Sequence, residues 1–426
     1  MASPLSPPGS IRRAGRNASH PMRRTSTKGP LETAEDPLAA TPAPPEVARV
    51  NTEEALPQIT PSKAQDALLA NITRTLPPHL RFLQDPRLYH QIAKDDVPAA
   101  FLQSTSKPSS TTPLTDLLGH GHFRQAAEVA LRELLQASID DAQRILQLLY
   151  CRLACLTLIS RPDVAADEAL PLLDFITSNA SGVSEAVSLI PWSLRILLVR
   201  LQSIAAQDGG RRAIMALYGL AGEARANIRD ARSEGDEDAR SIWASRLFDL
   251  GLRVSDTLVE MGELETATRH LETLVGGSQD EVLIRKVLLR LRTGDVITAR
   301  RHFEELSQPD NRAVYGALLS SFDADVTDAV MSWRSLSQLS SHEVAAQNEA
   351  VFLLYSGRID EALHILETLV EKGLVFYTLL FNLSTMHELC SDNAESKKQD
   401  IAAKLASRAG QSSSTAWERS VVELKL

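Results

Sequence analysis

The 426-residue sequence predicts an all-α protein that is built as a solenoid of stacked helix pairs. Three observations support this prediction. First, 43% of the residues are hydrophobic but only 5% are aromatic, and Ala and Leu dominate, a bias that favours helices over strands. Second, GRIDEALHILETLV at 357–370 and GELETATRHLETLV at 262–275 are identical at seven of fourteen positions. Third, a short motif recurs at nearly constant spacing.

The motif is Gly-x-apolar-x-x-Ala, with Ala in place of Gly once. Its successive copies begin 32, 30 and 33 residues apart, and one isolated copy lies upstream. The copies contain Gly262, Leu264 and Ala267; Gly294, Val296 and Ala299; Ala324, Val326 and Ala329; Gly357, Ile359 and Ala362; and, upstream, Gly121, Phe123 and Ala126.

A helix–turn–helix unit explains this motif. Glycine ends the first helix because a left-handed cap costs it nothing. The apolar residue staples the turn, and the small Ala begins the second helix where the two helices approach closely. A period near 34 residues is typical of tetratricopeptide (TPR) repeats, which stack into a right-handed superhelix. One pair alone cannot cover its apolar face, so neighbouring pairs must do so.

Along the chain, the N-terminal tail is rich in Pro, Ser and Thr, and no aromatic residue precedes Phe82. We predict that this tail is disordered, because it cannot bury enough apolar surface to offset ordering entropy. The next segment holds short apolar clusters that either pack on the body or bind a partner, followed by a polar linker. The predicted divisions are a disordered tail at 1–62, short helical segments plus linker at 63–112, irregular helix pairs at 113–240, TPR-like repeats at 241–410 and a C-terminal extension at 411–426.

Apolar periodicity places the individual helices. In the irregular part they are expected at 142–160, 165–178, 191–207 and 211–232. In the repeats, helical runs at 242–261, 281–292, 312–322 and 344–355 precede the motif copies. A closing pair at 375–407 is expected to end in a helix whose polar outer face caps the solenoid and carries Lys397, Lys398, Asp400 and Lys404.

Charge and cysteine content exclude several classes of protein. A net charge of −9 argues against a general affinity for nucleic acid or anionic membranes. Three cysteines form no disulfide framework and indicate a reducing compartment. No run of about 18 apolar residues is present, as a membrane span would require. Residues 1–31 partly resemble a basic transit peptide, but their prolines would break its helix, so we expect a cytoplasmic protein.

No constellation of catalytic residues is found: the sequence lacks a phosphate-binding glycine loop, His-Glu-x-x-His and Cys-x-x-Cys. We therefore predict no enzyme, no cofactor, and no catalytic or metal-binding residue. Cys151 and Cys155 share a helical face and are either a metal or redox pair or two core residues; we favour the core. Two-residue groups such as His120 with His122, expected at a turn surface, or His387 with Cys390, do not make a metal site.

Two kinds of binding protein remain. One is a structural adaptor whose repeats hold other subunits, and the other is a free-standing peptide-binding TPR adaptor of the chaperone co-factor type. TPR grooves can grip a C-terminal carboxylate with Lys and Asn on their inner helices. Asn348 and Asn382 lie about one repeat apart, but companion basic residues are not evident.

Several segments resemble the transport protein particle (TRAPP) complex subunit 12 family, whose members contain TPR repeats. The likeness extends in order over about 112–406, and its most specific block is Asn382–Leu389 followed by Lys397 and Lys398. The segments are PLTDLL (113–118), FRQAAEVA (123–130), PWSLRILLVRLQ (191–202), IWASRL (242–247), NEAVFLLYSGRIDEALHILETLV (348–370) and LLFNLSTMHELCSDNAESKKQDIAAKLA (379–406).

The resemblance implies a non-catalytic scaffold subunit of a TRAPP III-type complex, a vesicle tether and Rab exchange factor. The expected process is ER-to-Golgi trafficking in the early secretory pathway, with a connection to autophagy. Its expected partners are other TRAPP subunits, most of all the subunit 11 type, with a Rab GTPase engaged only through the complex. The resemblance implies no nucleic-acid partner and no direct membrane insertion. The chain would be cytoplasmic and associate with ER–Golgi and early Golgi membranes through the complex.

Overall fold

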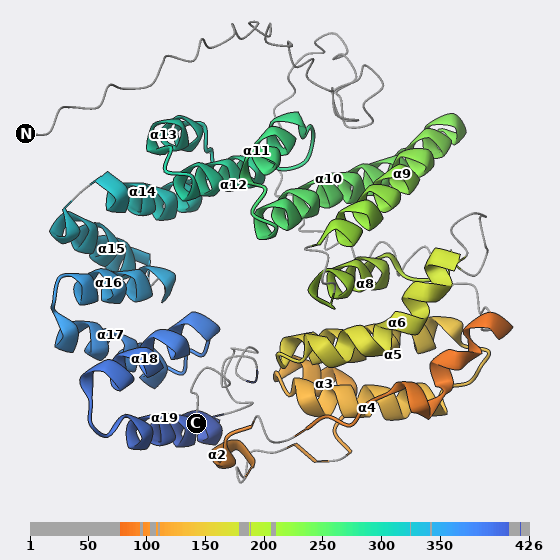
Figure 1. The fold of residues 1–426 in the computed structure, drawn as a ribbon, viewed down its shortest axis with the longest axis horizontal. Coiled ribbons are helices and arrows are strands. Elements are labelled where there is room, and N and C mark those ends of the chain that lie inside the picture. Colours follow the sequence, from red (N-terminus) through yellow and green to blue (C-terminus); the bar gives the residue numbers. More distant parts are fainter. Residues whose placement is uncertain are drawn as a thin grey trace, which may run out of the picture.

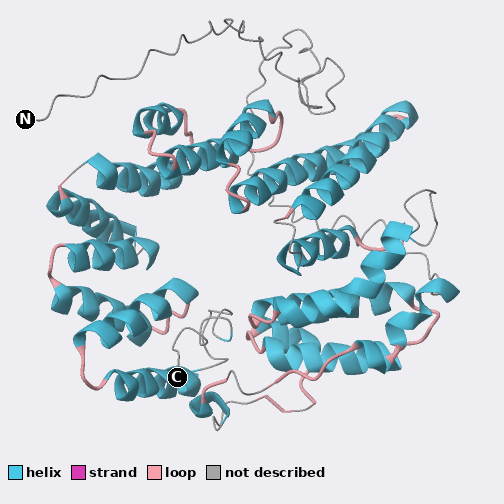
Figure 2. Cartoon of the chain, in the orientation of Figure 1, coloured by secondary structure: helices cyan, strands magenta, loops and turns pink. Residues whose placement is uncertain are grey.

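The structure is a computed structural model. The model describes residues 77–93, 97–102, 108–109, 111–178, 187, 189–205, 210–323, 325–340, 343–408 and 418. The predicted disordered tail lies outside the described residues, and so does the predicted C-terminal extension apart from Glu418. Every regular element in the described part of the chain is helical, as Figure 2 shows, which confirms the all-α prediction.

The first half of the body contains longer helices and the second half contains regular pairs. The first half comprises α3 (Leu114–Gly119), α4 (Phe123–Gln136), α5 (Ala142–Leu158), α6 (Pro162–Ser178), α8 (Trp192–Ala205), α9 (Arg211–Glu234) and α10 (Glu237–Glu260). The second half comprises α11 (Leu264–Thr273), α12 (Gln279–Arg292), α13 (Val296–Glu304), α14 (Pro309–Asp323), α15 (Val326–Ser340), α16 (Glu343–Tyr355), α17 (Ile359–Glu371), α18 (Tyr377–Cys390) and α19 (Ala394–Arg408).

Helix starts follow local capping chemistry. The side chains of Asp141, Asp236, Ser278 and Asp295 each accept a hydrogen bond from a backbone N–H in the first turn of the helix that follows. Asp236 accepts from the N–H of Ala239 at 2.9 Å, so α10 begins at Glu237, five residues before the predicted start. Acidic residues in the first turn, Glu237 and Asp238, also suit the positive end of the helix dipole.

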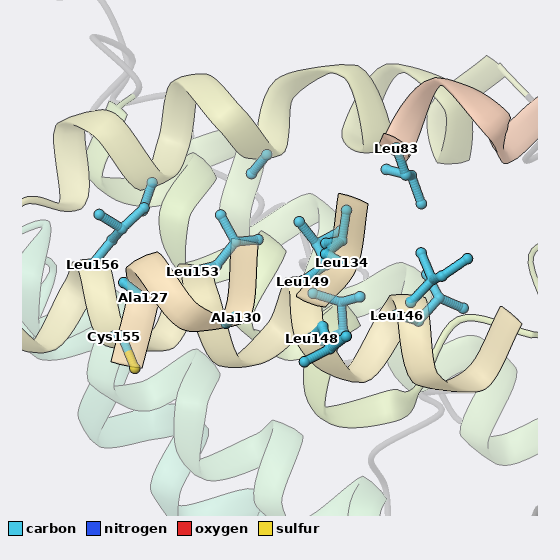
Figure 3. Packing of buried hydrophobic residues seen from close by; sticks show 14 of the residues in the cluster. Leu83, Ala127, Ala130, Leu134, Leu146, Leu148, Leu149, Leu153, Cys155 and Leu156 are labelled. Atoms are coloured by element: carbon cyan, nitrogen blue, oxygen red, sulfur yellow. The ribbon is translucent and has the colours of Figure 1, made fainter. Parts of the chain in front are cut away.

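The core is divided along the solenoid, as expected where each pair contacts mainly its neighbours. One large apolar cluster joins α3 to α8, a second joins α8 to α12, and a third joins α15 to α19, with two small clusters between them. In the first cluster, Leu153 and Leu156 of α5 face Ala127 and Ala130 of α4, and Leu83 packs at the edge (Figure 3). Small residues on α4 allow α5 to approach closely.

The helix pairs follow one another around a nearly closed ring (Figure 1). The path runs from α3 and α4 through α9 and α10 to α13, and returns so that α19 lies beside the short helix α2 (Ala99–Leu102), on the side of the ring where α3 and α4 begin. The two ends of the solenoid lie toward each other, with α2 between them. The helix-pair solenoid itself is as predicted.

A short segment before the first helix pair packs on the body. It contains two 3₁₀ helices, η1 (Pro78–Gln84) and η2 (Pro86–Leu88), and the single-turn helix α2 (Ala99–Leu102). Leu80 is 0% exposed and Leu83 is 2% exposed, both within the α3–α8 cluster. For residues 78–93 and 97–102 the structure shows packing on the body, whereas the start of the predicted segment, 63–76, lies outside the described residues.

The end of the solenoid differs from the prediction. Lys398 was expected on a polar outer face of the last helix, but its side chain is buried and its Nζ pairs with Glu388. Helix α19 is covered instead by α2, whose Phe101 is buried in the same cluster as Ile401 and Leu405. The second half of α19 carries the apolar residues that this cover buries or adjoins, Ile401, Ala402, Leu405 and Ala406.

Candidate interaction surface

The glycines of the repeat motif have left-handed backbones. Gly121, Gly262, Gly294 and Gly357 have φ values of 74°, 80°, 81° and 79°. Each one lies two residues after the last residue of a helix; for example, α10 ends at Glu260, and the N–H of Gly262 donates to the carbonyl of Val259 at 3.1 Å. Such φ values favour glycine because a Cβ would be strained there. Ala324, which takes the glycine position in the third copy, lies outside the described residues.

The alanines of the motif are completely buried. Those at 126, 267, 299, 329 and 362 are all 0% exposed. They do not begin the second helix of each pair, as we had expected: the helices begin three residues earlier, at the apolar position of the motif. That apolar position is variable, because Phe123 is buried whereas Ile359 is 37% exposed and therefore does not staple its turn.

Two helices of the C-terminal repeats expose apolar and aromatic side chains. On α16, Val344 and Tyr355 are 48% and 77% exposed, and the half-buried Asn348 and Val351 lie between them at helical spacing. On α18, Tyr377 and Phe381 are 45% and 39% exposed. We name these six residues the α16–α18 face.

The two helices of this face lie side by side. The hydroxyl of Thr378 on α18 donates to the side-chain oxygen of Gln347 on α16 at 3.0 Å. The rings of Tyr377 and Phe381 are nearly parallel, with centroids 6.5 Å apart and planes 2° apart. Helix α18 lies on the inner side of α17 in the ring (Figure 1). Exposed aromatic rings in a rigid array are the side chains that protein interfaces favour.

A small hollow of about 230 Å³ lies between α8, α9 and α10. Its charged lining residues are already paired. Arg200 contacts Glu260 at 2.5 Å, Arg253 contacts Asp249 at 2.7 Å, and Asp256 contacts Arg285 at 3.1 Å. These residues therefore offer little uncompensated charge to a ligand.

The residues singled out for chemistry do not assemble into a metal site. Among the described residues, no group of three His, Cys, Asp or Glu side chains is placed to hold an ion. Burial raises the pKa of Cys155 to about 12 and also raises the pKa of Cys151, so both thiols are protonated at neutral pH. Burial lowers the pKa of His387.

The His120–His122 pair was expected at a turn surface, and only one of the two is exposed. The Nδ1 atom of His120 lies 2.7 Å from the carbonyl oxygen of Asp116, at the end of α3. His122 is buried, and that burial lowers its pKa. The two imidazoles therefore face different environments.

A buried ion pair was not anticipated from the sequence. The side chains of Arg152 on α5 and Glu168 on α6 are 1% and 0% exposed. Nη2 of Arg152 lies 2.6 Å from Oε1 of Glu168, and Nε of Arg152 lies 2.7 Å from Oε2 of Glu168. The backbone of His90 completes the arrangement: its N–H donates to Glu168 at 2.9 Å and its carbonyl accepts from Arg152 at 2.8 Å. The sequence signal that could have indicated this ion pair is Arg152, a charged residue in the middle of the apolar run QRILQLLYCRLACLTL.

The stacked helix pairs and the left-handed glycines of the repeat turns define a TPR-like helical solenoid. In the part of the chain that the structure covers, no helix has the length and apolarity needed to cross a bilayer. No family model matches the sequence.

Two curated relatives are similar to part of the chain. The sequence is 24% identical over 236 residues to "Trafficking protein particle complex subunit 12" of Homo sapiens, covering 51% of this chain and 30% of that protein. The Mus musculus protein of the same name is also 24% identical over 236 residues, with 28% of its length covered. The chain thus matches less than a third of the length of these relatives.

Two solved structures overlap with the chain only loosely. The assembly chaperone of RpL4 (Acl4) is 15% identical, with 67% of this chain and 96% of that chain covered and a TM-score of 0.27. The P58(IPK) TPR domain is 11% identical, with 70% and 95% covered and a TM-score of 0.21. TM-scores this low indicate neither a shared curvature nor a shared function.

Proposed function

We propose that this chain is a non-catalytic scaffold subunit of a TRAPP III-type complex, which tethers vesicles and acts as an exchange factor for a Rab GTPase. It would hold other subunits together in ER-to-Golgi trafficking and in the connected autophagy pathway. The observation that carries this proposal is the 236-residue similarity to trafficking protein particle complex subunit 12. The repeat-turn residues would set the spacing of the helix pairs.

The α16–α18 face supports a scaffold role. It presents aromatic rings on two helices fixed by their packing, so a partner could bind it with little loss of conformational entropy. It also adjoins the sequence block Asn382–Leu389, where the family likeness is most specific. We assign this face to contact with another tether subunit, the subunit 11 type being the first candidate.

Recruitment to membranes would be indirect. The chain would be cytoplasmic and reach ER–Golgi and early Golgi membranes through the complex, and it would meet a Rab GTPase only there. Flotation of the isolated chain with liposomes of early-secretory lipid composition tests this part. Flotation with the vesicles would contradict indirect recruitment.

Affinity purification of the tagged full-length chain from its source cells tests the function. The expected result is recovery of TRAPP subunits in constant proportion, with crosslinks from a partner subunit to α16 or α18. A double variant, Tyr377→Ser with Phe381→Ser, should lose that partner. Ile297→Ser on α13 is the matched control because Ile297 is 72% exposed but lies outside the α16–α18 face.

The outcomes separate the two kinds of adaptor. Absence of every tether subunit, together with a monodisperse monomer that binds a short peptide, would favour the free-standing TPR adaptor and contradict the proposal. Retention of all subunits by the double variant would refute only the assignment of the face.

A further inference from the structure

Residues 78–93 contact one end of the solenoid and residues 97–102 contact the other, and we call these two segments together the strap. Its first half is anchored in the α3–α8 cluster. The side-chain amide of Gln84 donates to the carbonyls of Leu134 and Ala137 at 3.1 and 2.8 Å, which satisfies the C-terminal end of α4. The backbone of His90 binds the buried Arg152–Glu168 pair, and the guanidinium of Arg124 donates to the carbonyl of Ala93.

The second half of the strap is anchored at the other end of the chain. Helix α2 packs against α19, and its Phe101 is 5% exposed within the cluster formed by α15–α19. Val97 and Ala100 are partly buried in the same place. These contacts join residues near position 100 to residues near position 400.

The distance between the two anchors is limited by the chain. Ala93 and Val97 are separated by four Cα–Cα steps of 3.8 Å, so they lie at most about 15 Å apart. Ala93 accepts a hydrogen bond from Arg124 near the start of α4, and Val97 packs against the cluster that α2 shares with α19. The short connection between them therefore keeps the two ends of the solenoid near each other. The ring in Figure 1 has this geometry.

The two anchors differ in strength. The first combines two buried leucines, the Gln84 hydrogen bonds and the contacts of His90 with a buried ion pair. The second is a single helical turn of four residues with one buried aromatic ring. A helix this short has no stability of its own and depends on the contact that it makes. Local opening is expected first where fewest apolar contacts hold a segment.

We propose that the strap holds the ring closed and that α2 is its detachable joint. Release of α2 uncovers the apolar side of α19 while the first half of the strap stays bound. The two ends of the solenoid can then move apart, so the ring has a closed and an open form. The opening is limited by the ten-residue stretch from Arg408 at the end of α19 to Glu418, whose carboxylate accepts a hydrogen bond from the N–H of Arg124 on α4 at 2.7 Å. This inference concerns conformation alone and does not depend on the proposed function.

Hydrogen exchange and small-angle X-ray scattering on the full-length chain test the proposal. Phe101→Asp places a charge in the buried site, and Leu102→Asp is the matched control because Leu102 is 38% exposed on the same turn. We expect Phe101→Asp to speed amide exchange in α19 at least tenfold, a rough figure for losing one buried aromatic contact. The radius of gyration should rise for this variant only, and exchange in α5 and α6 should stay unchanged.

Three results would overturn the proposal. The first is unchanged exchange in α19 and an unchanged radius in Phe101→Asp. The second is an equal effect of the control substitution. The third is acceleration that extends through α5 and α6, because α2 would then be part of one cooperative core. If Phe101→Asp does not fold, the wild-type chain in low denaturant decides: α2 and α19 must exchange before α4–α6, and simultaneous exchange contradicts a separate joint.

Discussion

Replacing Glu168 by Leu should cost more stability than any substitution of an exposed charge in this chain. Arg152 would remain 1% exposed and would lose both of its contacts to a carboxylate, at 2.6 and 2.7 Å. It would keep the carbonyls of Ala127 and His90, at 3.2 and 2.8 Å, and the ring of Tyr89, whose centroid lies 5.5 Å from its guanidinium carbon. The N–H of His90 would also lose its acceptor.

The expected magnitude follows from these contacts. Breaking a buried ion pair by removing one partner costs about 3–5 kcal/mol, because an uncompensated charge stays buried. We therefore expect a loss of about 4 kcal/mol in the stability of the α3–α8 part. A double variant, Arg152→Met with Glu168→Leu, should recover most of that loss, since no buried charge remains.

Native-state hydrogen exchange in increasing denaturant measures the effect on α5 and α6 separately from the rest of the chain. The control is Glu265→Ala, which removes an exposed pair with Arg269 whose side chains are 80% and 67% exposed. That change should cost less than about 1 kcal/mol. A loss below about 1 kcal/mol for Glu168→Leu, or a double variant no better than the single one, would refute the reasoning.

Three further predictions concern the repeats and the chain end. Gly357→Ala should destabilise the chain by about 1–2 kcal/mol, because the backbone at Gly357 has a φ of 79°. Gly219→Ala in the middle of α9 should stabilise the chain by about 0.5–1 kcal/mol. Urea melts of the two variants should show these opposite signs. Ala362→Leu should reduce the stability of the chain by about 1–3 kcal/mol, because Ala362 is 0% exposed and a larger side chain overpacks its site. Ala313→Leu on the exposed surface of α14 is the control and should leave the stability nearly unchanged in thermal melts. The carboxyl of Glu418 accepts a hydrogen bond from the N–H of Arg124 on α4 at 2.7 Å, and burial raises its pKa from 4.5 to about 7. The docking of Glu418 on α4 should therefore be most stable below pH 4.5 and weaken as the pH rises to about 7. Carboxyl NMR titration measures the pKa, and Glu418→Gln should remove this pH dependence.

The helix pairs were predictable because their signals are local. A glycine at a left-handed position and an alanine one turn into the next helix are both read within six residues, and the structure places the pairs accordingly. Helix ends were predicted less well where a polar cap extends a helix beyond its apolar pattern, as Asp236 does for α10. The family likeness pointed to a scaffold but covers only part of the curated relatives.

Closure of the ring was not predictable because it depends on contacts between distant segments. Phe101 sits in a short apolar cluster with no periodicity, and nothing in it indicates contact with α19. Glu168 and Arg152 are 16 residues apart on different helices, so their pairing follows only from the packing of α5 on α6. Lys398 was assigned to a polar face by its charge, although its long side chain allows its amine to reach Glu388 while the stem is buried.

The state of the native chain in a lysate of its source cells tests the central claim most directly. Sedimentation through a glycerol gradient, with detection of this chain and of TRAPP subunits, makes the comparison without a tag or overexpression. A scaffold subunit should sediment with the other tether subunits, far ahead of a monomer, and should shift with them when one of them is depleted. Sedimentation as a monomer, unchanged by that depletion, would contradict the account.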